Sequence, residues 1–302
     1  MKGSVLHRRY SMVIKGSLIK DEIKEAAMKT WEDKIMEAII ESSSEMKKSL
    51  QIISSVVEDL QEIFDPYFIE SIKYKKLELP KKSKQVHKQL LKCGWYLYNL
   101  IELPMEEVEG IYNIINSDLR STEEEFIAKI DSYMNNLINR NSDIIIDDIC
   151  TMYPKRSKII KDAYNVHKQE LYTLSIPCIL TQTDGISKDI LGKSIYSKSK
   201  HEPISMKQIK KILKDNNIEK NQEDLIYSIQ YYPLETITSL SINDDKVLDG
   251  EHYFVLNRHA VIHGLDTEYA NMTNSNKCIA ILGYLYNLKR AIDYNIESSK
   301  NK

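Results

Sequence analysis

Apolar residues recur at helical spacing through much of the chain. The spacing predicts amphipathic helices over residues 19–39 and 50–64, where every third or fourth position carries an apolar side chain. Asp65-Pro66 closes the second of these helices, because proline disfavours the helical conformation in the residue before it. The first part of the chain is therefore expected to be helical.

Two short motifs predict further helix starts. Thr122-x-x-Glu125 is a capping box, in which the threonine side chain and the glutamate side chain satisfy each other's free backbone N–H groups. Ser205-x-x-Gln208 has the same form, and Asn216 ends the helix that it opens.

The pattern is less decisive in two other places. Ile144–Ile146 fits a short strand or a buried helical segment equally well. Residues 159–183 are predicted as one helix that ends at Asp184-Gly185, with a kink at Pro177 unless the helix begins later.

Composition strengthens the helical prediction. The 302 residues include only 9 Gly and 7 Pro, which disfavours glycine-turned β sandwiches and glycine-looped nucleotide folds. We expect an all-α helical bundle. Pro154 marks a boundary between a helical N-terminal region, residues 1–152, with a regulatory or dimerisation role, and a helical domain over residues 153–302.

Charge and cysteine usage exclude several protein classes. The 42 Lys and Arg against 44 Asp and Glu give a net charge of -2, which excludes a histone-like basic protein and an acidic disordered one. The four cysteines are far apart and form no CxxC pair, so we expect reduced core residues. No stretch is apolar enough for a signal peptide or a membrane span, which predicts a soluble cytoplasmic protein with no membrane partner.

Lysines concentrate in two stretches, residues 73–92 and 193–214. A solvated helix face is the favoured interpretation, since such runs are common, and a phosphate-binding surface is the alternative.

The segment from Asn257 to Gly264 concentrates the candidate chemistry. On a helix advancing about 100° per residue, His259 and His263 share a face, whereas Arg258 and His263 diverge by roughly 140°. Arg258 projects among apolar neighbours, and burying an arginine is costly unless it meets a carboxylate. The candidate carboxylates are Asp184, Asp266 and Glu268.

Spacing alone favours a purely structural interpretation, in which Arg258 anchors a core ion pair and both histidines are ordinary half-buried residues. A zinc site is weaker still. The HxxxH run at His259 and His263 lacks the glutamate of HExxH, and a third protein ligand would have to come from a distant residue.

A family resemblance changes this balance. The run Arg258–His263 resembles the R-x4-H motif of the HEPN superfamily, in which Asn, Asp or His often follows the arginine, as His259 does here. The resemblance extends through residues 269–285, begins upstream at Tyr172, and is weak around Gly94-Trp95. The motif stands just ahead of a final amphipathic helix.

The resemblance implies a helical bundle that dimerises so that two motifs face each other in one cleft. It also implies a metal-independent endoribonuclease with no cofactor. His263, with an intrinsic pKa near 6.5, then exchanges protons, and Arg258 binds phosphate oxygens and stabilises the transition state. His259 is either a second proton-transfer group or a packing or dimer-contact residue.

Supporting roles are expected for Asp184, Asn257 and Tyr269. Asp184 either positions Arg258 through a charge-assisted pair or simply belongs to a helix stop. Some relatives carry tyrosine two residues after the histidine; Leu265 stands there in this chain, and Tyr269 comes later.

The expected partners are RNA, a second copy of the chain and a neutralising or activating protein, in a bacterial toxin or anti-phage defence effector. The lysines expected to guide the RNA backbone are Lys193, Lys207, Lys210 and Lys211. The alternative is a non-catalytic helical module that binds RNA, a nucleotide or a protein and keeps Arg258 and His263 as ligand or core residues.

Overall fold

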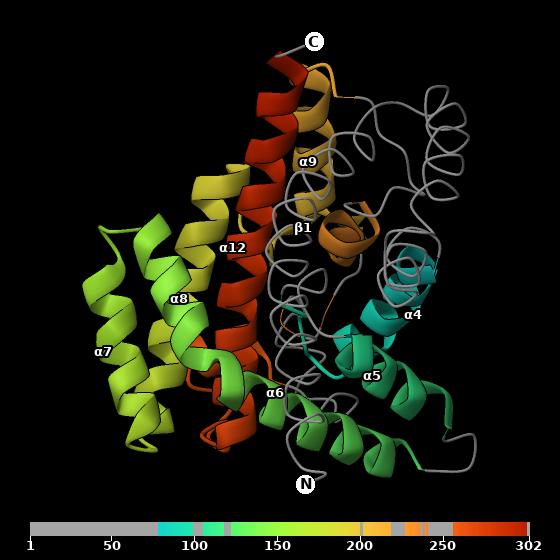
Figure 1. Ribbon diagram of the computed structural model, residues 1–302. Helices are drawn as coiled ribbons and strands as arrows, with labels where there is room; N and C mark the ends of the chain where they lie inside the picture. The colour runs from blue at the N-terminus through green and yellow to red at the C-terminus, as the bar shows by residue number, and fades with distance from the viewer. Residues whose placement is uncertain are drawn as a thin grey trace, which may run out of the picture. The chain divides into compact units, whose positions relative to one another are not determined.

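Figure 1 shows the computed structural model of the chain. The chain divides into two compact units, Met1–Glu62 and Ile63–Lys302. The structure describes residues 78–98, 105–117, 122–199, 202–218, 227–235, 238, 240 and 256–300, which all belong to the second unit. The helices predicted over residues 19–39 and 50–64 lie outside the described residues, as do residues 73–77 of the first basic stretch.

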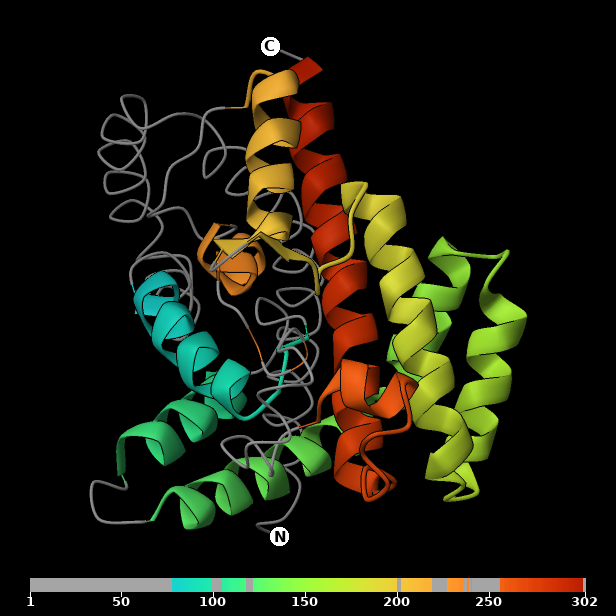
Figure 2. The ribbon, with the colours of Figure 1, turned by 180° about the vertical axis from the view of Figure 1, so that it is seen from behind.

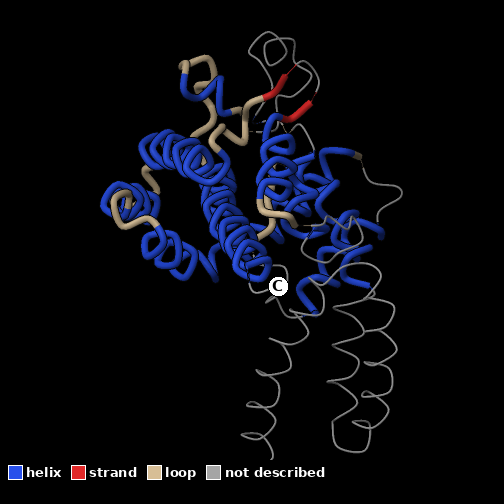
Figure 3. Tube along the Cα trace, turned by 90° about the horizontal axis from the view of Figure 1, so that it is seen from above, coloured by secondary structure: helices blue, strands red, loops and turns tan. Residues whose placement is uncertain are grey.

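The described part of the second unit is an all-α bundle, as the sequence predicts. Its α-helices are α4 (Leu79–Lys92), α5 (Met105–Ser117), α6 (Glu123–Met152), α7 (Ser157–Lys168), α8 (Tyr172–Leu191), α9 (Ile204–Asp215), α11 (Arg258–Ile262) and α12 (Met272–Lys300). Two short turns of helix, η2 (Tyr227–Tyr231) and η3 (Tyr232–Glu235), follow α9. An antiparallel pair of two-residue strands, β1 (Lys198–Ser199) and β2 (Glu202–Pro203), joins α8 to α9 and is red in Figure 3. Among the described helices, none combines the length and apolarity that a membrane span requires.

Helix α12 forms the centre of the packing. It contacts α6 and α8, and α7 packs against α6 and α8 in turn (Figures 1 and 2). The side chains from Cys278 to Leu282 are completely excluded from solvent. A helix that is apolar on most of its surface is stable only when neighbours cover it on more than one side, and α6 and α8 provide that cover.

The buried face of α12 also holds a charge. Lys277 is 1% exposed, and its Nζ lies 3.3 Å from Oδ1 of Asp131 on α6. Trp95 donates its indole N–H to the same carboxylate oxygen at 2.6 Å, and the Lys277 ammonium lies 5.4 Å from the centroid of the Trp95 ring. A buried ammonium is tolerated only with such partners, so this cluster fixes how α6, α12 and the segment after α4 meet.

The segment after α4 runs close along α12. Trp95 and Leu97 are buried in it, and the rings of Tyr96 and Tyr284 lie 5.0 Å apart. A Cβ atom at Gly283 would come within 2.7 Å of Cδ2 of Tyr98, so the close approach requires glycine at that position.

A second buried polar cluster joins α7, α8 and α12. Nδ1 of His167 lies 2.8 Å from Oγ of Ser275, which in turn lies 3.1 Å from Oγ of Ser175. The ring of Tyr164 stacks on that of His167 at 5.6 Å between centroids. Burial lowers the pKa of His167, and the neighbouring charge of Lys168 lowers it further.

Several local predictions are confirmed. The capping box is present, with Thr122 accepting from the backbone N–H of Glu125 and the Glu125 side chain accepting from that of Thr122. Asn216 caps the end of α9. Ile144–Ile146 adopts the helical alternative, as part of α6.

The prediction of one helix over residues 159–183 is wrong in its middle and at its C-terminal end, whereas the alternative of a helix that begins later, ahead of Pro177, is confirmed by α8. The chain breaks between α7 and α8, where Glu170 adopts a φ of 62°. Helix α8 then continues through Asp184-Gly185 and ends at Gly192, which has a φ of 70°. The glycine that stops the helix is therefore the later one.

The capping box predicted at Ser205 is also wrong. Helix α9 begins at Ile204 after Pro203, and the Ser205 hydroxyl donates to the backbone oxygen of Leu234 at 3.3 Å. The contact with η3 uses the hydroxyl that a capping box would need.

The boundary expected between residues 152 and 153 falls inside the second unit, in the turn between α6 and α7. These two helices contact each other, and α6 contacts α12.

Acid is expected to destabilise this unit through His167. An unfolded histidine has a pKa of about 6.5, whereas burial depresses the pKa of His167. The unfolded state therefore binds more protons than the folded state below neutral pH. The contribution of His167 to the free energy of unfolding is fully present above its unfolded-state pKa, and it is lost as the pH falls towards its folded-state pKa. The melting temperature of the wild type should fall between about pH 7.5 and about pH 5.5, and that of His167→Gln should fall less. The exposed His263→Gln is the matched control, and an identical pH dependence in all three proteins would contradict this account.

Candidate functional site

The short helix α11 carries Arg258 at its first position, and His263 caps its C-terminal end. Asn257 caps its start by accepting a hydrogen bond from the backbone N–H of Ala260 at 2.9 Å, and Gly264 follows with a φ of 71°. A β-region cap before Arg258 and a left-handed glycine after His263 limit the helix to five residues. Asn257, expected as a supporting residue, thus fixes where the motif helix begins.

The two histidines lie together, as their spacing predicts. The ring centroids of His259 and His263 are 4.2 Å apart with 41° between the ring planes. His259 is half-buried, while His263 is exposed. The pair therefore joins a partly enclosed imidazole to one that solvent or a ligand reaches directly.

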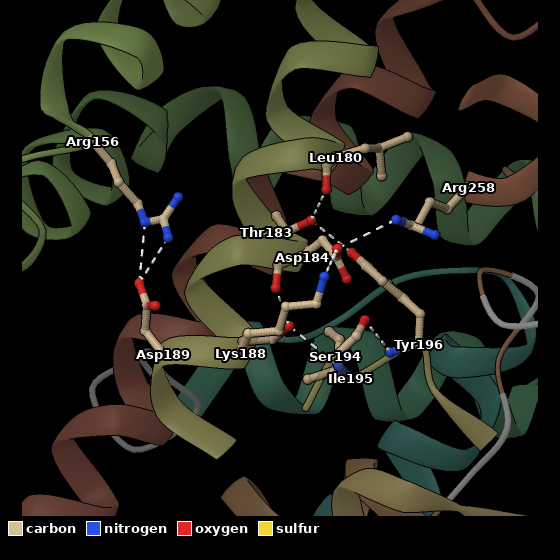
Figure 4. A network of polar contacts seen from close by, with 11 residues as sticks. Arg156, Leu180, Thr183, Asp184, Lys188, Asp189, Ser194, Ile195, Tyr196 and Arg258 are labelled. Atoms are coloured by element: carbon tan, nitrogen blue, oxygen red, sulfur yellow. Dashed lines mark hydrogen bonds and ion pairs between the residues drawn. The ribbon is translucent and has the colours of Figure 1, made fainter. Parts of the chain in front are cut away.

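Arg258 is held from two directions (Figure 4). Its Nη2 lies 3.4 Å from Oδ2 of Asp184, and its guanidinium lies 5.3 Å from the centroid of the Tyr196 ring. Its side chain is 26% exposed, and its buried Nε has no hydrogen-bond partner among the described residues. The guanidinium is thus fixed by a carboxylate and an aromatic face, with part of it still open to solvent.

Asp184 lies in the middle of α8 and is 13% exposed. Lys188, one turn further along, donates to its Oδ2 at 2.7 Å. Burial raises the pKa of Asp184, but hydrogen bonds from Lys188 and Ser194 and the charges of Arg258 and Lys188 outweigh it, so the net pKa is lowered. The carboxylate is therefore ionised at neutral pH. Because α8 continues past Asp184 to Leu191, the alternative that Asp184 belongs to a helix stop is wrong.

The loop after α8 folds back to complete the support. Thr183 donates its hydroxyl hydrogen to the Leu180 carbonyl, so the Tyr196 hydroxyl, 2.7 Å away, is the donor to Thr183. The Ser187 hydroxyl accepts from the backbone N–H of Ile195 at 3.2 Å. In Figure 4, Thr183 and Tyr196 lie beside the Arg258–Asp184 pair, and the Tyr196 ring is the platform for the guanidinium.

Tyr269 contacts a residue that is far from it in the sequence, and residue spacing could not predict this contact. Its hydroxyl donates to the backbone oxygen of Thr173 at 3.1 Å. In a helix that oxygen would accept from residue 177, but Pro177 has no N–H to give. Tyr269 therefore satisfies the carbonyl that Pro177 leaves free, and it ties the segment after α11 to the first turn of α8.

Lys188, Ser194 and Tyr196 were not predicted as site residues. The Asp184-to-Lys188 spacing of four residues was a usable signal for an ion pair on one helix face. Ser194 and Tyr196 carried no such signal, because they reach the site through a loop that returns on α8.

The lysines expected to guide RNA lie on the surface. Lys193 is exposed just after Gly192. Lys207, Lys210 and Lys211 are exposed on α9, at spacings that place them on neighbouring positions of its outer surface.

Within the described ranges, no three His, Cys, Asp or Glu side chains are grouped so that they could hold a metal ion. Comparison with protein-family models, with curated proteins and with solved structures finds no match to the chain. The site offers three reactive groups: a fixed guanidinium, an exposed imidazole and a neighbouring half-buried imidazole.

The bond from Tyr269 to Thr173 is testable by a double-mutant cycle. Tyr269→Phe should destabilise the protein by about 1 kcal/mol, the ordinary contribution of such a bond. In a Pro177→Ala background the restored N–H satisfies the Thr173 carbonyl, so the same change should cost clearly less. Denaturant unfolding of the four proteins measures both costs; equal costs in the two backgrounds would contradict the link.

Proposed function

We propose that this chain is a metal-independent endoribonuclease of the HEPN type, with Arg258 and His263 as its catalytic residues. The observation that supports it best is the arrangement on α11. An arginine fixed by Asp184 and Tyr196 begins the helix, and an exposed histidine caps its C-terminal end. The R-x4-H resemblance supplies the assignment to this superfamily.

The reaction needs no group beyond those on RNA and on this chain. The 2′-oxygen attacks the neighbouring phosphorus, and the bond from phosphorus to the 5′-oxygen breaks. A base takes the proton of the 2′-hydroxyl, and an acid gives a proton to the leaving oxygen. The products are a 2′,3′-cyclic phosphate and a 5′-hydroxyl, and the chain and solvent return to their starting protonation states.

The residues divide this work by their chemistry. His263 transfers the protons as general base or acid, and Arg258 stabilises the charge that gathers on the phosphate oxygens. Asp184 positions Arg258 and keeps it pointed across the Tyr196 ring. His259, 4.2 Å from His263 between ring centroids, is close enough to serve as the second proton-transfer group.

A second copy of the chain is the expected partner at this site. Large apolar side chains are exposed at the start of α8, on and after α11, and at the start of α12: Leu171, Leu174, Ile262, Leu265 and Met272. Exposed apolar side chains gathered near a site are typical of interaction surfaces. A homodimer through this surface would bring two motifs into one cleft.

Light scattering should report a dimer that Leu265→Asp weakens, and a strict monomer would contradict the composite cleft.

RNA then crosses the exposed lysines of α9 and Lys193, through contacts that weaken with salt and carry no sequence information. A toxin or anti-phage defence role, restrained by a neutralising partner or released by an activating one, is the biology we propose for such an enzyme in a bacterial cytoplasm.

One observation favours a second candidate function. Arg258 is already paired with Asp184 and covers the Tyr196 ring, which also suits a purely structural ion pair. The protein would then be a non-catalytic helical module that binds RNA, a nucleotide or a protein.

RNA cleavage in EDTA separates the two. Arg258→Ala and His263→Ala should each lower the cleavage rate at least about 100-fold, because each removes a group used in the transition state. The exposed Arg140→Ala is the matched control for loss of one arginine and should cleave like the wild type. Circular dichroism checks that every variant keeps its helices. Cleavage that survives both substitutions rejects the site, and RNA retention without products supports the binding module.

A further inference from the structure

A hollow of about 620 Å³ lies where α6, α7 and α8 meet, apart from the motif helix. Figure 4 shows the Arg156–Asp189 pair on one side of α8 and Arg258 on the other. Hollows of roughly 300 to 1,000 Å³ are the size that small-molecule ligands occupy. The residues that line it have no part in the proposed cleavage.

Arg156 is held in place within this hollow before any ligand arrives. Its Nε and Nη2 donate to Oδ2 of Asp189 at 3.2 and 2.8 Å, and its Nη1 donates to Oε1 of Gln182 at 3.3 Å. These three bonds leave one N–H on each terminal nitrogen for another acceptor. Because its orientation is already fixed, an anion that binds there loses little free energy to ordering the side chain.

Gly185 makes this orientation possible. A Cβ atom at residue 185 would lie 2.6 Å from Nη1 and 2.9 Å from Cζ of Arg156. The guanidinium therefore rests directly on the backbone of α8. This close approach explains why a glycine stands in the middle of the helix, where its low helix propensity is unfavourable.

The remaining lining residues define the ligand. Lys155 adds a second cation to Arg156, and Asp189 is the carboxylate among the residues that line the hollow, so the lining favours an anion overall. Tyr153 and Pro154 offer flat apolar surfaces. Burial, with the charges of Asp189 and Asp293, raises the pKa of Tyr153 to about 12, so its ring is neutral and does not repel an anion.

Asp189 makes a simple inorganic anion or a fatty acid a poor fit. Its Oδ2 accepts both bonds from Arg156, which leaves Oδ1 to accept from a ligand, and its side chain is 49% exposed. The best ligand therefore has a negative group, hydroxyl or amine donors and a flat body.

We propose that this hollow binds a nucleoside monophosphate, with its phosphate on Arg156 and Lys155, a ribose hydroxyl or base amine on Asp189, and its base against Tyr153 and Pro154. The site is independent of the cleavage site, and its test needs no RNA.

Titration calorimetry on the full chain tests the proposal with adenosine and uridine 5′-monophosphates. At least one should bind, and inorganic phosphate and the matching nucleoside should each bind at least about tenfold more weakly, a difference of about 1.4 kcal/mol. Equal binding of inorganic phosphate, or no binding of any nucleotide, overturns the proposal.

Three variants locate the site. Arg156→Gln should lower the affinity at least about tenfold, since it removes the charged fork. Lys158→Gln, two residues further along in the first turn of α7 and with a side chain 85% exposed, should not change it. Gly185→Ala keeps the charge and favours the helix by up to about 1 kcal/mol, yet displaces the guanidinium, so it should also weaken binding. Wild-type affinity in either Arg156→Gln or Gly185→Ala overturns the site, and the second variant keeps the test open if the first does not fold.

Discussion

The burial of α12 is the constraint on which the rest of the second unit depends. With Cys278 to Leu282 wholly excluded from solvent, α6 and α8 must cover the helix on more than one side. That arrangement leaves Lys277 inside, and an ammonium there is stable only because Asp131 and Trp95 meet it. The position of α8, and with it Asp184, follows from the packing on α12.

The same helix then serves two arginines. On one side of α8, Asp184 fixes Arg258 against Tyr196, and on the other, Asp189 and Gln182 fix Arg156 over Gly185. In both places a carboxylate on a rigid helix orders a guanidinium in advance, which is the property that binding and transition-state stabilisation require. The two sites differ in what stands beside the arginine: imidazoles next to Arg258, flat apolar side chains next to Arg156.

Features that depend on nearby residues were predictable from the sequence. The helical class, the capping box at Thr122 and the shared face of His259 and His263 all follow from local spacing. An arginine among apolar neighbours requires a carboxylate partner, so the pairing of Arg258 with one of three carboxylates was predictable. The family resemblance pointed to Asp184 among them.

Features that depend on distant contacts were not predictable. Gly185 resembles a helix stop in the sequence, but Arg156 packs on it within a continuing helix. Ser205 resembles a cap, but its hydroxyl binds the carbonyl of Leu234. The break between α7 and α8 at Glu170 contains neither glycine nor proline, so the sequence gives no local signal for it.

The most direct test of the cleavage account is the chemistry of the ends that the wild type leaves on RNA in EDTA. The account predicts 2′,3′-cyclic phosphate and 5′-hydroxyl ends, and no cleavage of the same strand carrying 2′-O-methyl groups throughout. Fragments with 5′-phosphate ends, or cutting of the methylated strand, would show that the 2′-hydroxyl is not the nucleophile and would contradict the account.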